Sequence, residues 1–281
     1  MTRNLNLEEF VQRNLDKVFI VMDTETSGLD VKESDAIEVS AIKARFNGRK
    51  IEVLDTFDSF INPGYPLSEA ILEFNRKNNT GVDDAFLADK PKAAAVARAL
   101  AAFFRKDPAC VENSCWTLVG HNIVRFDVPY IEKLAAAGNV SLTNAYTFDT
   151  MLHAQSIIPF RGKGTHTLGR LHESTPQRLF KENPLYHNSL GDCLATLDIL
   201  EQFAEKVLDA ELRKQEAKAA EPVKPAATTE LPRPAFRVQR AEPEAAYKPA
   251  TPPSPENIPP ERPMLRLRLA SSLVQEEQKE R

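Results

Sequence analysis

Two carboxylates stand one residue apart near the start of the chain, directly after an apolar run. Asp23 and Glu25 follow residues 18–22 (VFIVM), a run that is typical of a buried β-strand. Because side chains on a strand alternate between its two faces, both carboxylates point the same way. Two negative charges in a poorly solvated place repel each other, and one of them is driven to take up a proton. The pair therefore suggests a bound cation, and a metal ion would supply it.

Two more aspartates and a histidine could complete such a metal site. In LVGHNIVRFDVPYI, Asp127 follows the end of an expected strand and stands near the start of an expected helix. In HNSLGDCLATLDIL, His187 precedes Asp192 by five residues, and Asp192 lies early in an amphipathic helix. An aspartate on the apolar side of a helix is costly unless it is paired or bound to a metal. Carboxylates from three separate segments are therefore candidate ligands, with His187 near the last of them.

The elements that must position these residues indicate a mixed α/β fold. Residues 36–46 and 50–63 alternate in character and are joined by Asn47 and Gly48, which is a strong hairpin signal. Further strands are expected at 18–22 and 116–122, and helices at 68–78, 91–106, 128–138, 166–173 and about 189–218. Three antiparallel strands, further strands and helices packed on the sheet make one coherent core.

Glycine and proline usage divides the chain into a folded domain and a tail. All ten glycines lie at or before Gly191, whereas twelve of the twenty prolines lie at or after Pro222. The proline-rich composition favours an extended, solvated chain with too little apolar surface to offset its ordering entropy. We therefore predict a folded domain over residues 1–212 and a flexible, disordered tail over 213–281. Within the tail, residues 264–274 (MLRLRLASSLV) are either a slightly apolar patch or a segment that docks on a partner's sheet.

Bulk composition gives no sign of a membrane span and argues against a protein that coats nucleic acid. No run approaches the ~20 apolar residues of a membrane-spanning helix, and the charged segment 1–18 lacks the apolar core of a signal peptide. Three cysteines, of which Cys110 and Cys115 lack the partners and spacing of a zinc site, favour a reducing, cytoplasmic location. The net charge of −4 opposes strong non-specific attraction to nucleic acid, but it does not exclude a nuclease.

The acidic motifs resemble those of a known enzyme superfamily. The segments DTETSG at 23–28, HN…FD at 121–127 and H…GD…T at 187–196 have the order and intervals of the three exonuclease motifs of the DEDD superfamily. The spacing of His187 to Asp192 matches the histidine-bearing branch, which includes the proofreading subunit of bacterial replicative DNA polymerase, ribonuclease T and oligoribonuclease. The resemblance covers about residues 16–208, with Ser27 in place of a common threonine. It implies a ribonuclease H-like α/β fold with a mixed five-stranded sheet flanked by helices.

The resemblance also implies a role for each motif residue. Asp23 would bridge two divalent ions, Mg²⁺ or Mn²⁺, which suit a cage of carboxylates without cysteine. Glu25 and Asp192 would complete the site that holds the attacking water, and Asp127 would hold the second ion. His187, whose unperturbed pKa would be about 6.5, would act as general base toward that water.

Substrate contacts beyond the metals are less strongly marked. By the same resemblance, Thr26 would lie beside the terminal sugar, and Asn122 and Phe126 would lie near the terminal nucleotide. For Asn122 and Phe126, a purely structural role is an equal alternative. His121 has two interpretations of equal weight, because it could line the site and touch substrate or simply satisfy buried backbone groups.

Loop 159–166 (PFRGKGTH) is another candidate for substrate binding. Its Arg161 and Lys163 stand among glycines, which suits an approach to backbone phosphate, although a plain solvated loop explains the pattern equally well. No stripe of aromatic and basic residues marks a long single-strand channel, so we expect only a few terminal nucleotides to be held. The remaining histidines have no metal-ligand spacing, and His172 among them is expected at the surface.

The residues together favour a metal-dependent 3′→5′ exonuclease that releases nucleoside 5′-monophosphates. DNA is the favoured substrate because the motif set and the proline-rich tail fit the proofreading-subunit pattern best, and an RNA-trimming enzyme of the ribonuclease T or oligoribonuclease type is the alternative. Segment 264–274 is then a candidate for docking on a polymerase. Two other classes stay open: a non-catalytic nucleic-acid-binding or scaffold module, which should have lost a ligand, and a phosphoesterase acting on small nucleotides.

Overall fold

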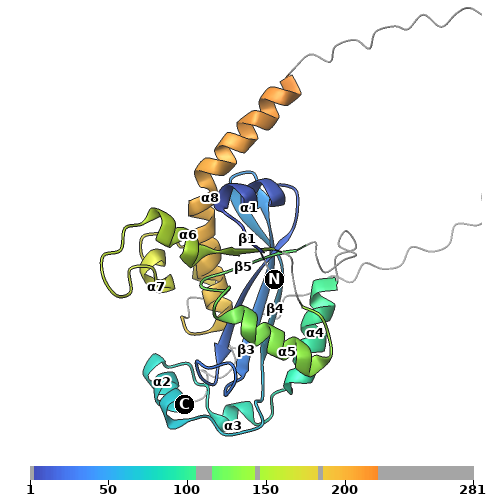
Figure 1. The fold of residues 1–281 in the computed structure, drawn as a ribbon, viewed down its shortest axis with the longest axis vertical. Helices are drawn as coiled ribbons and strands as arrows, with labels where there is room; N and C mark the ends of the chain where they lie inside the picture. Colours follow the sequence, from blue (N-terminus) through green and yellow to red (C-terminus); the bar gives the residue numbers. More distant parts are fainter. Residues whose placement is uncertain (1–2, 106–115, 143–145, 183–185, 221–281) are drawn as a thin grey trace, which may run out of the picture. The chain divides into compact units, whose positions relative to one another are not determined.

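The computed structural model describes residues 3–105, 116–142, 146–182 and 186–220 of the chain (Figure 1). The chain divides into two compact units, Met1–Val223 and Lys224–Arg281. The second unit lies outside the described residues, and so does the docking segment predicted at 264–274. Cys110 and Cys115 also lie outside the described residues, whereas Cys193 is a buried free thiol.

A mixed six-stranded sheet forms the centre of the first unit. In sequence order its strands are β1 (Arg3–Asn4), β2 (Phe19–Thr26), β3 (Ala36–Asn47), β4 (Lys50–Phe60), β5 (Thr117–Gly120) and β6 (Tyr146–Asp149). They lie in the order β1-β6-β5-β2-β3-β4. The strands β2, β3 and β4 are antiparallel neighbours, and Asn47 pairs with Lys50 across the predicted hairpin. The remaining pairs, β2 with β5, β5 with β6 and β1 with β6, are parallel.

The predicted mixed sheet with three antiparallel strands is confirmed, but its predicted size of five strands is wrong. The additional strand is β1, in which Arg3 and Asn4 pair with Tyr146 and Thr147 of β6. A two-residue strand is too short for any alternation of side chains, so no sequence period can reveal it. Strand β1 is recognised only by its pairing with β6, which lies more than a hundred residues further along the chain.

Helices cover both faces of the sheet. They are α1 (Leu7–Asn14), α2 (Glu69–Asn78), α3 (Asp84–Leu87), α4 (Ala93–Arg105), α5 (Asp127–Gly138), α6 (Thr150–Ile157), α7 (Leu168–His172) and α8 (Ser189–Ala220), with a 3₁₀ turn η1 (Phe180–Glu182). The last helix continues through residues 213–220, past the predicted domain boundary at residue 212. Among the described residues, no helix combines the length and the apolar character needed to cross a membrane.

The strand β2 contributes side chains to the two largest hydrophobic clusters of the unit. Phe19 and Val21 pack in a cluster with residues of α1 and α8, whereas Ile20 and Met22 pack in a cluster with residues of α4 and α5. Both faces are covered, so the strand is a continuous apolar run instead of an alternating one. By the same alternation, Asp23 and Glu25 continue the row of Val21 on the side of α8. The sheet therefore aims the two carboxylates toward the helix that carries Asp192.

Candidate active site

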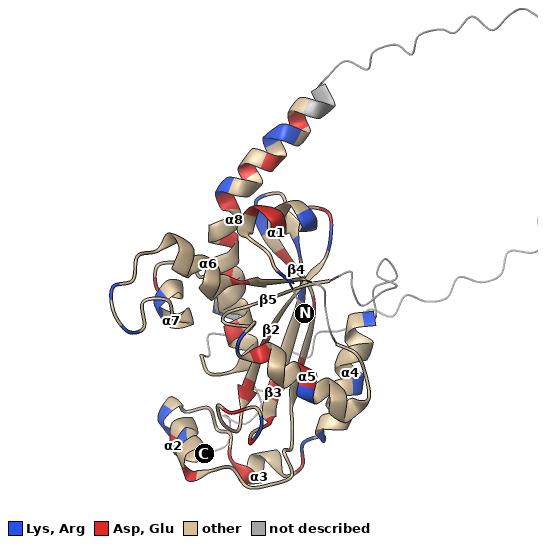
Figure 2. Cartoon of the chain, in the orientation of Figure 1, with Lys and Arg blue, Asp and Glu red and all other residues tan. Residues whose placement is uncertain are grey.

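The predicted acidic residues lie at the ends of three elements that meet at one edge of the core. Asp23 and Glu25 lie near the end of β2, Asp127 is the first residue of α5, and Asp192 lies in the first turn of α8. Figure 2 shows acidic segments of β2, β3 and the start of α8 in the same region. The structure thus brings together side chains that are more than a hundred residues apart in the sequence.

The carboxylates of this cluster raise one another's pKa values. Burial raises the pKa of Asp23 well above its ordinary value, and the charges of Asp127, Asp192, Glu25 and Glu38 raise it further. Such crowding costs free energy when every group is ionised, and without a cation it favours protonation. A cation beside Asp23 and Glu25, as the sequence predicts, would relieve this repulsion between the buried carboxylates.

Three other members of the cluster show the same effect. Burial, followed by the charges of nearby acids, raises the pKa of Glu25 to about 8. Burial also raises the pKa of Asp192 to about 7, although a hydrogen bond from the backbone of His187 opposes the shift. For Asp127, burial raises the pKa to about 7 against hydrogen bonds from Thr24 that lower it. These groups are therefore poised to lose protons when a positive charge enters.

Glu25, His187 and Asp192 form a group that fits a metal ion. Each offers a ligand atom, and these atoms lie within 4.8 Å of one another. Within the described part of the chain, Oδ1 of Asp192 is buried and has no hydrogen-bond partner, which leaves its lone pairs available. Hard divalent ions such as Mg²⁺ and Mn²⁺ prefer carboxylate oxygen. Asp23 and Asp127 are not members of this three-residue group. The charge of Asp127 raises the pKa values of Glu25 and Asp192, and the charges of Glu25 and Asp192 raise the pKa of Asp23.

His187 lies at the mouth of the site in an unusual backbone conformation. Its φ angle is 57°, in the left-handed region that non-glycine residues seldom occupy. The imidazole is exposed and packs edge-on against the ring of Phe74, with ring centroids 5.1 Å apart. Partial burial lowers the pKa of His187 below its ordinary value. A neutral imidazole that still reaches solvent can accept a proton.

Glu38 is a fifth carboxylate of the site, and our sequence analysis did not predict it. It lies directly across from Glu25 in the β2–β3 pairing and is only 2% exposed. Burial and the charge of Asp58 raise the pKa of Glu38 to about 8. The signal was present in the sequence, because Glu38 is a lone acid in a run of apolar and small residues (AIEVSA). The local sequence does not give the register between β2 and β3, and this register is what places Glu38 opposite Glu25.

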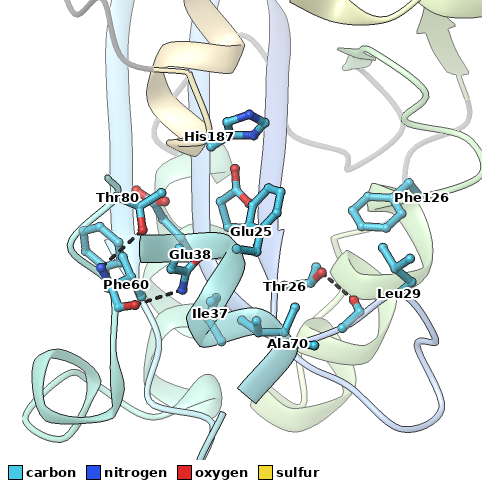
Figure 3. Close-up of a pocket in the computed structure, with 15 residues that line it drawn as sticks. Glu25, Thr26, Leu29, Ile37, Glu38, Phe60, Ala70, Thr80, Phe126 and His187 are labelled. Atoms are coloured by element: carbon cyan, nitrogen blue, oxygen red, sulfur yellow. Dashed lines mark hydrogen bonds between the residues drawn. The ribbon is translucent and has the colours of Figure 1, made fainter. Parts of the chain in front are cut away.

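A cavity of about 340 Å³ opens beside the acidic cluster (Figure 3). Most of its lining is apolar, and the polar groups Glu25, Glu38 and His187 lie at one part of its wall. Figure 3 shows Phe126 and Leu29 together on the opposite part, with Thr26 between them and Glu25. The hydroxyl of Thr26 donates to the carbonyl of Gly28 at 2.6 Å. The volume and the mixed lining are those of a small-ligand site.

The structure separates the predicted substrate residues into two sets. Thr26 and Phe126 line the cavity, whereas His121, Asn122 and Lys163 are not among its lining residues. The ring nitrogens of His121 hydrogen-bond with the Thr150 hydroxyl at 3.0 Å and the His166 carbonyl at 2.9 Å. Asn122 donates its backbone N–H to Asp149 at 3.0 Å.

The glycine-rich loop is shaped by its glycines. Lys163 is exposed between Gly162 and Gly164, which have φ angles of 124° and 88°. The backbone N–H of Arg161 donates to the hydroxyl of Thr165 at 3.0 Å, which closes the loop on itself. The loop therefore has a defined local structure, and its two basic side chains stay candidates for phosphate contacts.

His172, expected at the surface, is completely buried. Its Nδ1 hydrogen-bonds with the hydroxyl of Tyr186 at 2.7 Å, and its Nε2 with Oδ2 of Asp198 at 3.2 Å. The expectation failed because α7 is short and packs against α8, where Asp198 provides a buried acceptor. A buried histidine needs partners for both ring nitrogens, and only the tertiary structure brings these partners together.

A mixed sheet that gathers buried carboxylates and a histidine beside a cavity defines a candidate metal-dependent active site. The sequence profile of the exonuclease (RNase T) family matches residues 20–200. This match covers most of the chain, so the chain belongs to that family, and the resemblance to the DEDD exonucleases seen in the motifs is confirmed. All the motif residues discussed above lie within the matched range.

Individual relatives agree with this assignment. The chain is 28% identical over 194 residues to the DNA polymerase III PolC-type of Bacillus cereus, a match that covers 69% of this chain and 12% of the polymerase. It is 31% identical over 153 residues to the PolC-type polymerase of Streptococcus agalactiae, covering 53% of this chain and 9% of that protein. The chain thus matches a small part of these long relatives.

A solved structure shares the fold. The crystal structure of Escherichia coli Exonuclease I in complex with a dT13 oligonucleotide matches with a TM-score of 0.50 and 16% identity. The match covers 70% of this chain and 43% of Exonuclease I. At this level of identity, the likeness concerns the fold alone.

Proposed function

We propose that the protein is a metal-dependent 3′→5′ exonuclease that acts on DNA and releases nucleoside 5′-monophosphates. The observation that carries the proposal is the group of Glu25, His187 and Asp192, whose ligand atoms lie within 4.8 Å of one another beside the cavity. Family membership supports the hydrolytic activity, and the site explains how these residues could perform it.

The carboxylates supply the binding site for the metal ions. Glu25 and Asp192 are proposed ligands because their oxygens are gathered, and Asp192 Oδ1 has no partner within the described residues. Asp23 and Asp127 are added from the motif pattern, and each interacts electrostatically with members of the same group. Two divalent ions held there, Mg²⁺ or Mn²⁺, would stabilise charge on the phosphoryl oxygens and on the leaving oxygen.

His187 is the proposed general base. Partial burial lowers the pKa of the imidazole, so at neutral pH the ring is mostly neutral and one ring nitrogen can take a proton from the attacking water. The side chain is exposed beside the carboxylates, where such a water would stand (Figure 3). Because His187 also belongs to the three-residue group, the alternative role for its imidazole is that of a metal ligand.

The cavity is the proposed binding place of the terminal nucleotide. Phe126 and Leu29 offer apolar surface for a base, and Leu29 is 86% exposed in the described structure. Thr26 lies beside the proposed sugar position, and a phosphate joined to that sugar would face Glu25. His121, Asn122 and Lys163 lie outside the cavity lining and stay proposals for contacts with the rest of the strand.

DNA is favoured because the PolC-type relatives that match the chain are named as DNA polymerases. The same names support a proofreading or repair role, and docking on a polymerase through residues 264–274 is part of the proposal. RNA trimming is the alternative within the same chemistry. A cytoplasmic location likewise stays a prediction.

The test uses the full chain and 5′-labelled DNA and RNA oligonucleotides of equal sequence, with Mg²⁺, Mn²⁺ or EDTA. We expect metal-dependent shortening from the 3′ end that is faster for DNA and is lost in Asp192→Ala. Glu173→Gln is the matched control, because it removes an exposed carboxylate that forms an ion pair with Arg170 at 3.2 Å and does not belong to the group of Glu25, His187 and Asp192. Faster shortening of RNA would move the assignment to a trimming exoribonuclease. Absence of shortening in a folded, metal-loaded protein would leave a scaffold or a small-nucleotide phosphoesterase.

A further inference from the structure

The backbone at His187 requires support from its surroundings. A φ angle of 57° places this non-glycine residue in the left-handed region, which costs free energy. Such a conformation persists only where neighbouring contacts hold it. The neighbours on either side of His187, Tyr186 and Asn188, both have hydrogen bonds to buried side chains.

The first anchor follows His187 in the chain. The side-chain amide of Asn188 donates to Oε1 of Glu38 at 2.6 Å, and the backbone N–H of Ser189 donates to Oε2 at 3.3 Å. Glu38 is 2% exposed and is paired with Glu25 across the two strands, so its position is set by the sheet. One carboxylate thereby ties the start of α8 to the centre of the sheet.

The second anchor precedes His187. The hydroxyl of Tyr186 hydrogen-bonds with Nδ1 of His172 at 2.7 Å, and Nε2 of His172 hydrogen-bonds with Asp198 at 3.2 Å. Asp198 also accepts hydrogen bonds from the backbone of Leu179 at 2.8 Å and Phe180 at 3.0 Å. His172 and Asp198 are both buried, so this chain of contacts connects Tyr186 to the interior of α8.

We propose that Glu38 and His172 are positioning residues that hold His187 over the carboxylate cluster, Glu38 through Asn188 and Ser189, and His172 through Tyr186. The inference rests on the proposed function for its effect on catalysis. His172 is buried outside the cavity lining, and Glu38, which lines the cavity, acts in this role through its hydrogen bonds with Asn188 and Ser189. Phe74 completes the arrangement, because its ring packs edge-on against the imidazole and limits how far the ring can swing toward α2.

Two conservative substitutions test the anchors separately. Tyr186→Phe removes only the hydroxyl that contacts His172, and Glu38→Gln keeps the size of the side chain but weakens its double acceptor role. We expect each to lower kcat by about tenfold while KM changes less than about twofold, because a misplaced general base slows the chemical step without weakening substrate binding. Tyr146→Phe is the matched control, since it removes a tyrosine hydroxyl from a different surface, beside Arg13.

The decisive measurement repeats both substitutions in a His187→Ala background. If the anchors act through His187, the double variants are no slower than His187→Ala alone, because the coupling energy cancels the separate effects. A kcat of the double variants about tenfold below that of His187→Ala would overturn the proposal. So would a higher half-saturating Mn²⁺ concentration for Glu38→Gln than for the wild-type protein, because this result would identify Glu38 as a metal ligand. Thermal unfolding of each variant separates these results from loss of the fold.

A second readout does not depend on activity. In the metal-free protein, the imidazole resonances of His187 should shift or broaden in Tyr186→Phe and Glu38→Gln, and stay unchanged in Tyr146→Phe. Unchanged resonances in all three variants would overturn the positioning role even if the enzyme is active. If the wild-type protein cleaves no polymer while the resonances do respond, the proposed function fails and the positioning of His187 stands.

Discussion

Thr24 donates two hydrogen bonds to a single oxygen of Asp127, from its backbone N–H at 3.0 Å and from its hydroxyl at 2.7 Å. Thr24 lies between Asp23 and Glu25, on the opposite face of β2. The contact therefore fixes the start of α5 against the strand that carries the first two acidic residues. It also supports the charged form of Asp127, because hydrogen bonds to a carboxylate lower its pKa.

Replacing Thr24 should weaken the site without removing a ligand. In Thr24→Val the hydroxyl bond is lost, so the pKa of Asp127 rises above its value of about 7 and fewer molecules are ionised at neutral pH. We expect activity at pH 7 to fall several-fold and to recover at pH 8.5 or at higher Mn²⁺ concentration. Initial rates across pH would show this. Thr56→Val on β4 is the control, and an equal loss at every pH would contradict the explanation.

Divalent ions should stabilise the protein more at alkaline than at acidic pH. The pKa values of Glu25 and Glu38 rise from 4.5 to about 8 on folding, and those of Asp127 and Asp192 rise from 3.8 to about 7. Between those limits the native state binds more protons than the unfolded state, so these groups make stability fall as pH rises. This loss of stability is absent below about pH 4 and is complete above about pH 8.

Thermal unfolding with EDTA and with Mn²⁺, at pH 5.5 and pH 8, measures this linkage. Because metal binds the ionised carboxylates, the Mn²⁺-induced rise in Tm should be larger at pH 8. Asp192→Asn should reduce that rise, whereas Glu173→Gln should leave it unchanged. A Tm increase that is the same at both pH values would count against a metal site built from these carboxylates.

His187 can be distinguished as a base or as a ligand. As a general base it should contribute about 10²- to 10⁴-fold to kcat, so His187→Ala should lose that much. The Mn²⁺-induced rise in Tm at pH 8 should survive the substitution if the carboxylates hold the ions. His153→Ala, which removes a histidine from the surroundings of Phe148 and Phe203, is the control. Loss of both kcat and the Tm response would assign His187 to the metal instead.

The aromatic wall of the cavity should affect binding more than chemistry. Stacking of a base on an aromatic ring contributes about 1–3 kcal/mol, so Phe126→Ala should raise KM for short oligonucleotides by about ten- to a hundredfold. The value of kcat should change much less. Leu54→Ala removes an apolar side chain that is 40% exposed on β4, outside the cavity lining, and should change neither constant. Steady-state rates with a trinucleotide would decide, and a selective fall in kcat would place Phe126 at the reacting phosphate instead.

The sequence by itself determined the chemical character of the site. Alternation along β2 is a local property, so it already placed Asp23 and Glu25 on one face. The same is true of the Asn47–Gly48 hairpin, whose geometry depends on adjacent residues and which the pairing of Asn47 with Lys50 confirms. Family membership also followed from the types and spacing of the motif residues, before any contact between them was known.

Only the tertiary structure decided which residues support that chemistry. The register of β3 against β2 sets Glu38 opposite Glu25, and the packing of α7 on α8 buries His172 against Asp198. Two-residue β1 exists because β6 provides its partner. In each case the free energy comes from a contact between distant segments, and no local period in the chain encodes such a contact. The residues proposed to perform the chemistry could therefore be named from the sequence, whereas those proposed to hold them in place could not.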